Sequence, residues 1–157
     1  MPKTPILQFG TSRFLQAHAD LFVSAARREG QEVGPITVVQ SSGGRERIQN
    51  TVQVNSVARG LSTATGWDRV LRVFVDEAEI VLSNTGDTGF TPVPVDMAPS
   101  FDQAMSYPAK LKLLLRARFE AGGQPIQIMP MELVANNGTV LKARGLALAE
   151  TDPPAFR

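Results

Sequence analysis

The sequence contains no cysteine and a single histidine, His18. Without cysteine the chain can form no disulfide scaffold, no thiolate metal site and no thiol nucleophile. One histidine excludes a metal site built from several histidines, unless a partner chain contributes ligands. No apolar run approaches the roughly 20 residues that cross a bilayer, and the N-terminus MPKTPILQFG lacks the apolar stretch and cleavage site of a signal peptide. We therefore expect a cytoplasmic protein that binds no metal and no membrane.

The sequence also has almost no net charge. The chain has 16 Lys and Arg against 15 Asp and Glu, so its net charge is +1. Such a balance gives no basic surface for nucleic acid. With 157 residues, 43% hydrophobic and 20% charged, the composition is that of one globular domain over residues 1–157. A chain of this length can bury about two thirds of its unfolded surface.

The first 45 residues have the pattern of a strand, a helix and a second strand. A short apolar run at 6–9 stops at Gly10, and apolar residues then recur at helical spacing up to Gly30. A β-branched run at 36–39 follows. Two strands joined through a helix pair in parallel by a right-handed crossover.

The alternation continues along the chain. The later elements that we expect are a weaker strand at 51–57, a helix over 67–75, a strand at 79–82, an irregular segment at 91–100, a helix over 106–120, a strand at 126–129 and a helix from 137 to before 152. The pattern predicts an α/β fold, a doubly wound and mostly parallel sheet with helices on both faces. Ligands of such sheets bind at the carboxyl ends of the strands, where GTSRF, QSSGGR, SNTGDTG and MELVANNG lie.

The turn after the first strand is a candidate pyrophosphate site. Gly10 can make the tight turn that directs helix N–H groups at a dinucleotide. The G-x-G-x-x-G fingerprint is met only at this first position, because Ser12 and Leu15 occupy the other two. Taken alone, the segment is equally consistent with a glycine turn before a helix cap.

The end of the second strand lacks the acid that commonly binds the ribose of NAD. Gln40 and Ser41 stand there, and both can hydrogen-bond ribose hydroxyls without repelling a 2′-phosphate. Arg45 can attract such a phosphate. The alternative is that Arg45 and Arg47 are solvated loop charges.

Two further residues have a chemical and a structural interpretation. His18 can act as a general base, but a lone histidine without an assigned partner is more often structural. Asn137, in the run Asn-Asn-Gly, either forms a turn before a helix or polarises a carbonyl at the end of a strand.

Six segments taken together, in order, resemble the mannitol dehydrogenase and hexuronate reductase family of long-chain polyol dehydrogenases. Within that family the sequence is most similar to tagaturonate and fructuronate reductases. The segments are FGTSRFLQAHADLF, ITVVQSSGGR, VNSVARGLS, EIVLSNTGDTGF, SYPAKLKLLLRARFEAG and MELVANNG.

The resemblance implies a Rossmann-type domain that binds NAD, with NADP not excluded, for hydride transfer to or from a sugar acid or polyol. It places Asn137 near the substrate carbonyl. The cofactor residues that it implies are Gly10, Ser12, Arg13 and Phe14 at the pyrophosphate, Gln40 and Ser41 at the ribose, and Ser83, Asn84 and Thr85 at the next strand end.

The family's helical C-terminal domain carries the motif Lys-x-x-x-x-Asn-x-x-His, and nothing after Asn137 matches it. The chain therefore resembles the nucleotide-binding half alone, and we expect it to be inactive without that missing domain. The alternative is a nucleotide-binding or interaction module that kept the fold without the chemistry.

Overall fold

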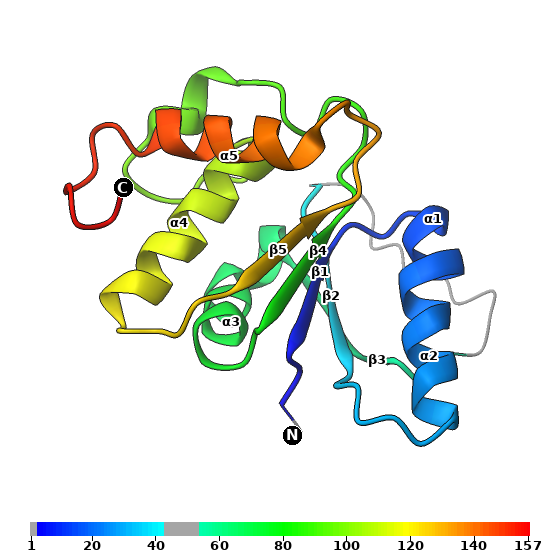
Figure 1. Ribbon diagram of the computed structural model, residues 1–157. Coiled ribbons are helices and arrows are strands. Elements are labelled where there is room, and N and C mark those ends of the chain that lie inside the picture. The colour runs from blue at the N-terminus through cyan, green and yellow to red at the C-terminus, as the bar shows by residue number, and fades with distance from the viewer. Residues whose placement is uncertain (1–2, 43–53) are drawn as a thin grey trace.

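The structure is a computed structural model that describes residues 3–42 and 54–157. Its centre is a five-stranded sheet in the order β3-β2-β1-β4-β5, and every strand pairing is parallel (Figure 1). The strands are β1 (Ile6–Phe9), β2 (Ile36–Gln40), β3 (Val57–Ser62), β4 (Ile80–Ser83) and β5 (Gln127–Pro130).

Helices cover both faces of the sheet. Because strand side chains alternate between faces, Leu7 and Phe9 of β1 pack in one core while Ile6 packs in the other. The first helical segment covers the Ile6 face, and α3 and α4 cover the opposite one (Figure 1). The expected doubly wound α/β fold is confirmed. The helices are α1 (Arg13–Leu15), η1 (Gln16–Asp20), α2 (Leu21–Arg28), α3 (Thr63–Asp76), η2 (Pro94–Met97), α4 (Tyr107–Glu120) and α5 (Asn137–Leu148).

The first helical segment contains a π-helical turn. The stretch expected to be one helix runs through α1, η1 and α2, and η1 has π geometry. Gly30 follows its end with a φ of +78°, as a glycine beyond a helix end often does. Asp20, at the end of η1, is buried and faces Gln8 of β1. Burial raises the pKa of the Asp20 carboxyl, and a hydrogen bond with Gln8 opposes this rise.

The expected bounds of the third strand are wrong. The third strand lies at Val57–Ser62 rather than at 51–57, where residues 51–53 fall outside the described part. It is an edge strand whose side chains are partly exposed, so its own sequence carries no buried apolar run. Helix α3 is kinked at Gly66, which has a non-helical φ of −153° and ψ of 38°. A short first turn from Thr63 precedes the kink, where the Ser62 hydroxyl accepts a hydrogen bond from the Ala64 N–H at 3.3 Å, and the main part of the helix starts at 67 as expected.

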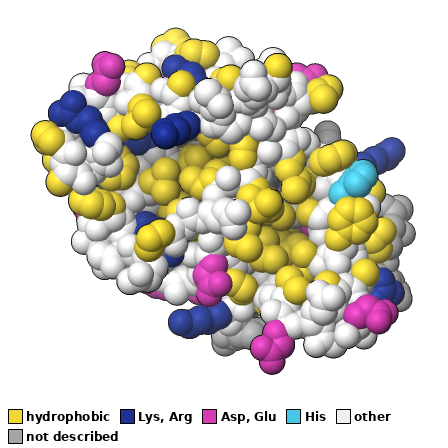
Figure 2. Space-filling model, viewed as in Figure 1, with side chains coloured by type: hydrophobic (Ala, Val, Ile, Leu, Met, Phe, Trp, Pro, Cys, Tyr) yellow, Lys and Arg dark blue, Asp and Glu magenta, His cyan; other side chains and the backbone are white. Residues whose placement is uncertain are grey.

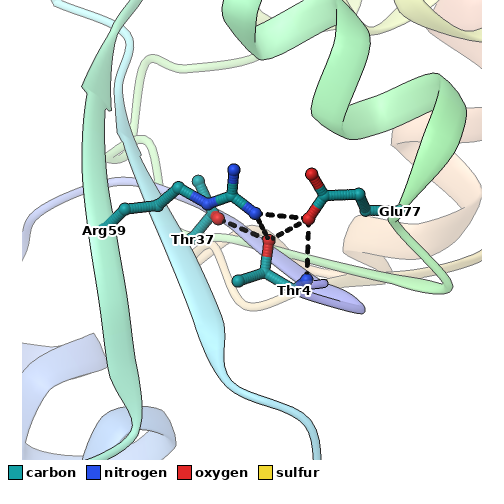
Figure 3. Close-up of polar contacts among 4 residues, drawn as sticks. All are labelled: Thr4, Thr37, Arg59 and Glu77. Atoms are coloured by element: carbon teal, nitrogen blue, oxygen red, sulfur yellow. Dashed lines mark hydrogen bonds and ion pairs between the residues drawn. The ribbon is translucent and has the colours of Figure 1, made fainter. Parts of the chain in front are cut away.

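A polar cluster joins the amino end of the sheet to the end of α3 (Figure 3). The Glu77 carboxylate accepts hydrogen bonds from the Thr4 N–H at 2.7 Å and the Thr4 hydroxyl at 2.9 Å, and it pairs with the Arg59 guanidinium. Thr37 of β2 shares a 2.7 Å hydrogen bond with the Thr4 hydroxyl. Burial raises the pKa of Glu77, but Thr4 and Arg59 outweigh it and leave that pKa below its ordinary value.

A buried arginine, Arg118, hydrogen-bonds to backbone carbonyls at and beyond the end of α3. Arg118 of α4 donates from Nη1 to the carbonyls of Phe74 at 2.6 Å and Ala78 at 2.8 Å, and from Nε to the carbonyl of Gln124 at 2.7 Å. These acceptors include carbonyls at the end of α3, which lack partners inside the helix. Arg118 therefore fixes α4 against the segment that leads from α3 into β4.

Within the described residues, no helix is long and apolar enough to span a bilayer.

We predict that Glu77→Gln lowers the free energy of unfolding at pH 7 by about 1 kcal/mol, since charged hydrogen bonds are lost. The folded-state pKa of Glu77 lies below its unfolded value, so its stabilisation is present above the unfolded pKa. That stabilisation disappears as the pH falls through the folded pKa. Urea unfolding at pH 7 and at pH 3 should therefore show a smaller difference between variant and parent at pH 3. Exposed Glu79→Gln is the control, and a deficit of equal size at both pH values would contradict the prediction.

Candidate functional site

The candidate site lies at the carboxyl ends of β1 and β4, where the strand order reverses. The chain passes from β1 to β2 and β3 on one side, and it adds β4 and β5 on the other. Two backbone hydrogen bonds join the strand ends: the Gly10 N–H donates to the Val39 carbonyl at 3.0 Å, and the Asn84 N–H donates to the Phe9 carbonyl at 2.9 Å. A reversal of this kind opens the crevice in which doubly wound folds bind nucleotides.

Gly10 is required at this position by contact and by conformation. A Cβ atom built on Gly10 would lie 2.4 Å from the Asn84 carbonyl oxygen, and the φ of Gly10 is +119°. Both values exclude an ordinary side chain. The turn after β1 therefore packs directly on the turn after β4.

The helix after this turn begins with a serine cap. The Ser12 hydroxyl accepts a hydrogen bond from the Leu15 N–H at 3.3 Å. The cap satisfies one N–H of the first turn, and the N–H groups of Arg13 and Phe14 have no acceptor among the described residues. Ser12 thus fixes the start of a helix whose first N–H groups are open to an anion.

His18 lies on the exposed side of this helix. Its ring stacks on Phe14 with centroids 4.4 Å apart and meets Phe22 edge-on at 6.0 Å. Its Nδ1 is 2.8 Å from the Phe14 carbonyl oxygen. These contacts give His18 a role on the helix surface, and its role as a general base stays a prediction.

The end of β2 is held by a second group of polar side chains. The Ser41 carbonyl accepts hydrogen bonds from Gln103 Nε2 at 2.9 Å, Lys110 Nζ at 3.0 Å and the Thr63 hydroxyl at 3.3 Å. Gln40 is buried, and its Nε2 donates to the Ser42 carbonyl at 3.3 Å. Burial lowers the pKa of Lys110, against the opposing charges of Asp102 and Asp96. The expected ribose residues therefore have a fixed backbone.

The structure does not describe Arg45, the residue expected to contact a 2′-phosphate. Arg45 and Arg47 both lie outside the described residues, so the choice between a 2′-phosphate contact and solvated charges stays a prediction.

The end of β4 is organised by Glu132, a residue that the sequence reasoning did not single out. Its carboxylate accepts hydrogen bonds from the Ser83 hydroxyl at 3.0 Å and from the N–H and hydroxyl of Thr85 at 3.1 Å each. The Asn84 amide donates to the Met131 carbonyl at 2.9 Å. Ser83 is fully buried beneath this network, whereas Thr85 is partly exposed, and the contact of these residues with a cofactor stays a prediction.

Asn137 lies at the start of α5, close to the same network. Its Nδ2 donates to the carbonyls of Pro130 at 2.9 Å and Glu132 at 3.1 Å, and its Oδ1 accepts from the Gly138 N–H at 2.7 Å. Asn136 before it has a φ of +53°. The side chain thus holds the turn that leads from β5 into α5, and its contact with a substrate carbonyl stays a prediction.

A large apolar cavity of about 610 Å³ borders this end of the sheet but is not the crevice. Figure 2 shows hydrophobic side chains gathered in the hollow between α5, α4 and β5. Aliphatic residues such as Leu111, Ile128 and Leu141 line it. Such a lining suits apolar groups and does not fit a sugar.

Among the described residues, no group of three or more His, Asp or Glu side chains could hold a metal ion.

Comparisons with known proteins show the fold and one relative of similar sequence. No protein-family model matches the chain. The chain is 26% identical over 168 aligned residues to an altronate oxidoreductase of Halalkalibacterium halodurans, an alignment that covers 87% of this chain. This similarity agrees with the resemblance that the six ordered segments carry. The chain spans 32% of the length of this curated relative.

Two solved structures share the fold. The chain superposes on a substrate-free D-sorbitol dehydrogenase with a TM-score of 0.76 and 20% identity, over 98% of this chain and 39% of the other. It superposes on the mannitol 2-dehydrogenase of Pseudomonas fluorescens, solved as a ternary complex with NAD and D-mannitol, with a TM-score of 0.81 and 15% identity. That match covers 98% of this chain and 38% of the other.

We predict that Gly10→Ala lowers the free energy of unfolding by about 2–4 kcal/mol, because the methyl group would meet the Asn84 carbonyl in a backbone conformation that alanine avoids. Gly145→Ala is the control. A Cβ on Gly145 meets nothing within 4 Å, and alanine favours its helix by about 1 kcal/mol. Thermal and urea unfolding measure both variants, and a Gly10→Ala protein as stable as its parent would contradict the packing of the two turns.

Proposed function

We propose that this chain is the nucleotide-binding part of a nicotinamide-dependent dehydrogenase. The observation that supports it most directly is the Gly10 turn, which packs on the end of β4 where the strand order reverses and leads into a capped helix. The fold fits a dinucleotide, because that helix offers the N–H groups of Arg13 and Phe14 to a pyrophosphate. Gln40 and Ser41, at the neighbouring strand end, are suited to the adenosine ribose.

The reaction that we propose is reversible hydride transfer between the nicotinamide ring and a sugar acid or polyol. The names of the relatives support it: one is an altronate oxidoreductase, and the neighbours are sorbitol and mannitol dehydrogenases. In this proposal the chain binds and orients the cofactor, and Asn137 lies beside the carbonyl or hydroxyl carbon of the substrate. The nicotinamide supplies the hydride chemistry when it is bound.

The proposed cofactor is NAD rather than NADP. The neighbouring mannitol 2-dehydrogenase was solved with NAD, which supports this choice for a protein of the same fold. Gln40 at the end of β2 can bond ribose hydroxyls without the repulsion that an acid exerts on a 2′-phosphate. Discrimination should therefore be weaker than an aspartate would give.

We predict that isothermal titration detects NAD binding, and that Gln40→Glu weakens NADP binding about tenfold or more while NAD binding changes little. The new carboxylate keeps the size of the side chain and repels the 2′-phosphate. Gln127→Glu, on an exposed position of β5, adds the same charge away from the crevice and should leave the ratio unchanged. If the parent binds neither cofactor, the dehydrogenase proposal fails and the interaction module takes its place.

We predict further that the 157-residue chain alone oxidises no NADH with tagaturonate or fructuronate. Hydride transfer to a carbonyl needs a group that delivers the hydroxyl proton. The resemblance places that group, a lysine, in the family's C-terminal domain. Absorbance at the NADH band follows the reaction, with the same chain and cofactor without sugar as the control. Substrate-dependent loss of NADH would contradict this and make His18, or Lys142 of α5, a candidate proton donor.

A further inference from the structure

Glu132 is a buried carboxylate that the proposed function does not yet use. It follows β5, is only 3% exposed, and receives all three of its hydrogen bonds from Ser83 and Thr85 of the neighbouring strand end. Every one of these groups donates to the carboxylate, and this arrangement stabilises negative charge. A neutral side chain would not need three donors directed at it.

No cation of the described residues balances this charge. The ion pairs of this part of the chain join other residues, and the described arginines and lysines are engaged elsewhere or exposed. The Glu132 charge acts on a neighbouring group: burial raises the pKa of the Tyr107 phenol, and the Glu132 charge adds to this rise. A buried charge without a counter-ion is costly, so a ligand cation is favoured beside it.

The strand order places Glu132 under one half of a bound dinucleotide. On the proposed function, the pyrophosphate lies at the helix start after β1, and the adenosine ribose lies at the end of β2. The remaining half must then extend to the other side of β1, over the ends of β4 and β5. Glu132 and Thr85 lie at these ends, so the nicotinamide half would occupy the space above them.

We infer that Glu132 selects the oxidation state of the cofactor. The oxidised nicotinamide ring carries a positive charge and the reduced ring is neutral, so the carboxylate attracts only the oxidised form. This inference rests on the proposed function and goes beyond it, because a fold that merely binds a dinucleotide needs no preference between the two forms. A purely structural Glu132 would support both forms equally.

The test is isothermal titration of the intact chain with NAD⁺ and with NADH. Glu132→Gln keeps the shape of the side chain and an oxygen that accepts the Thr85 N–H, and it removes the charge. We expect it to weaken NAD⁺ binding about tenfold relative to NADH binding. Glu132→Asp retains the charge and should preserve most of the preference. Glu150→Gln, an exposed acid beyond α5, should leave the ratio unchanged.

Each outcome bears on a different claim. If the parent binds both forms and Glu132→Gln weakens them equally, Glu132 has only a structural role and the inference is overturned, while the proposed function stands. If the parent binds neither form, the proposed function fails, and the inference fails with it. If the variant does not fold, the parent decides: NAD⁺ binding tighter than NADH binding supports the inference, and equal or weaker binding refutes it.

Discussion

The contact between Gly10 and the carbonyl of Asn84 sets the geometry of the whole crevice. The two turns can approach so closely only because one of them carries no side chain. From this point β2 and β3 extend in one direction and β4 and β5 in the other, so each half of the crevice is built on its own pair of strand ends. The helix cap at Ser12 then fixes the start of the helix that follows this turn.

Buried polar residues hold the sheet at both of its ends. At the amino end, hydrogen bonds between Thr4 and Glu77 join the residues before β1 to the segment after α3. At the carboxyl end, Lys110 fixes the backbone of Ser41, and Glu132 fixes the turn at Thr85. A charged group that is buried and fully hydrogen-bonded restricts its partners to one arrangement. The polar network therefore gives the strand ends the rigidity that a binding site requires.

The sequence alone predicts the central strands and the candidate turns, because strands buried on both faces are short apolar runs and glycines end them. It does not predict β3, an edge strand whose half-exposed side chains show no such run. It also misses Glu132. The partners of this residue lie 47 and 49 positions earlier in the chain, and no local pattern records a pairing over that separation. The sequence predicts correctly that a helix begins at Asn137, but the hydrogen bonds of this side chain to backbone carbonyls depend on the fold.

The two halves of the crevice differ in electrostatic character, and the difference matches an oxidised dinucleotide. On the β1 and β2 side lie the positive end of the helix that starts at Arg13 and the buried ammonium of Lys110. On the β4 and β5 side lies the buried carboxylate of Glu132. In the proposed orientation, an oxidised nicotinamide dinucleotide would place its negative pyrophosphate at the start of that helix and its positive ring on the side of Glu132. Reversing the ligand end for end would leave the central pyrophosphate in place and move the positive ring from Glu132 to the side of Lys110, so the charges that we propose to favour the oxidised form would also fix the direction in which it binds.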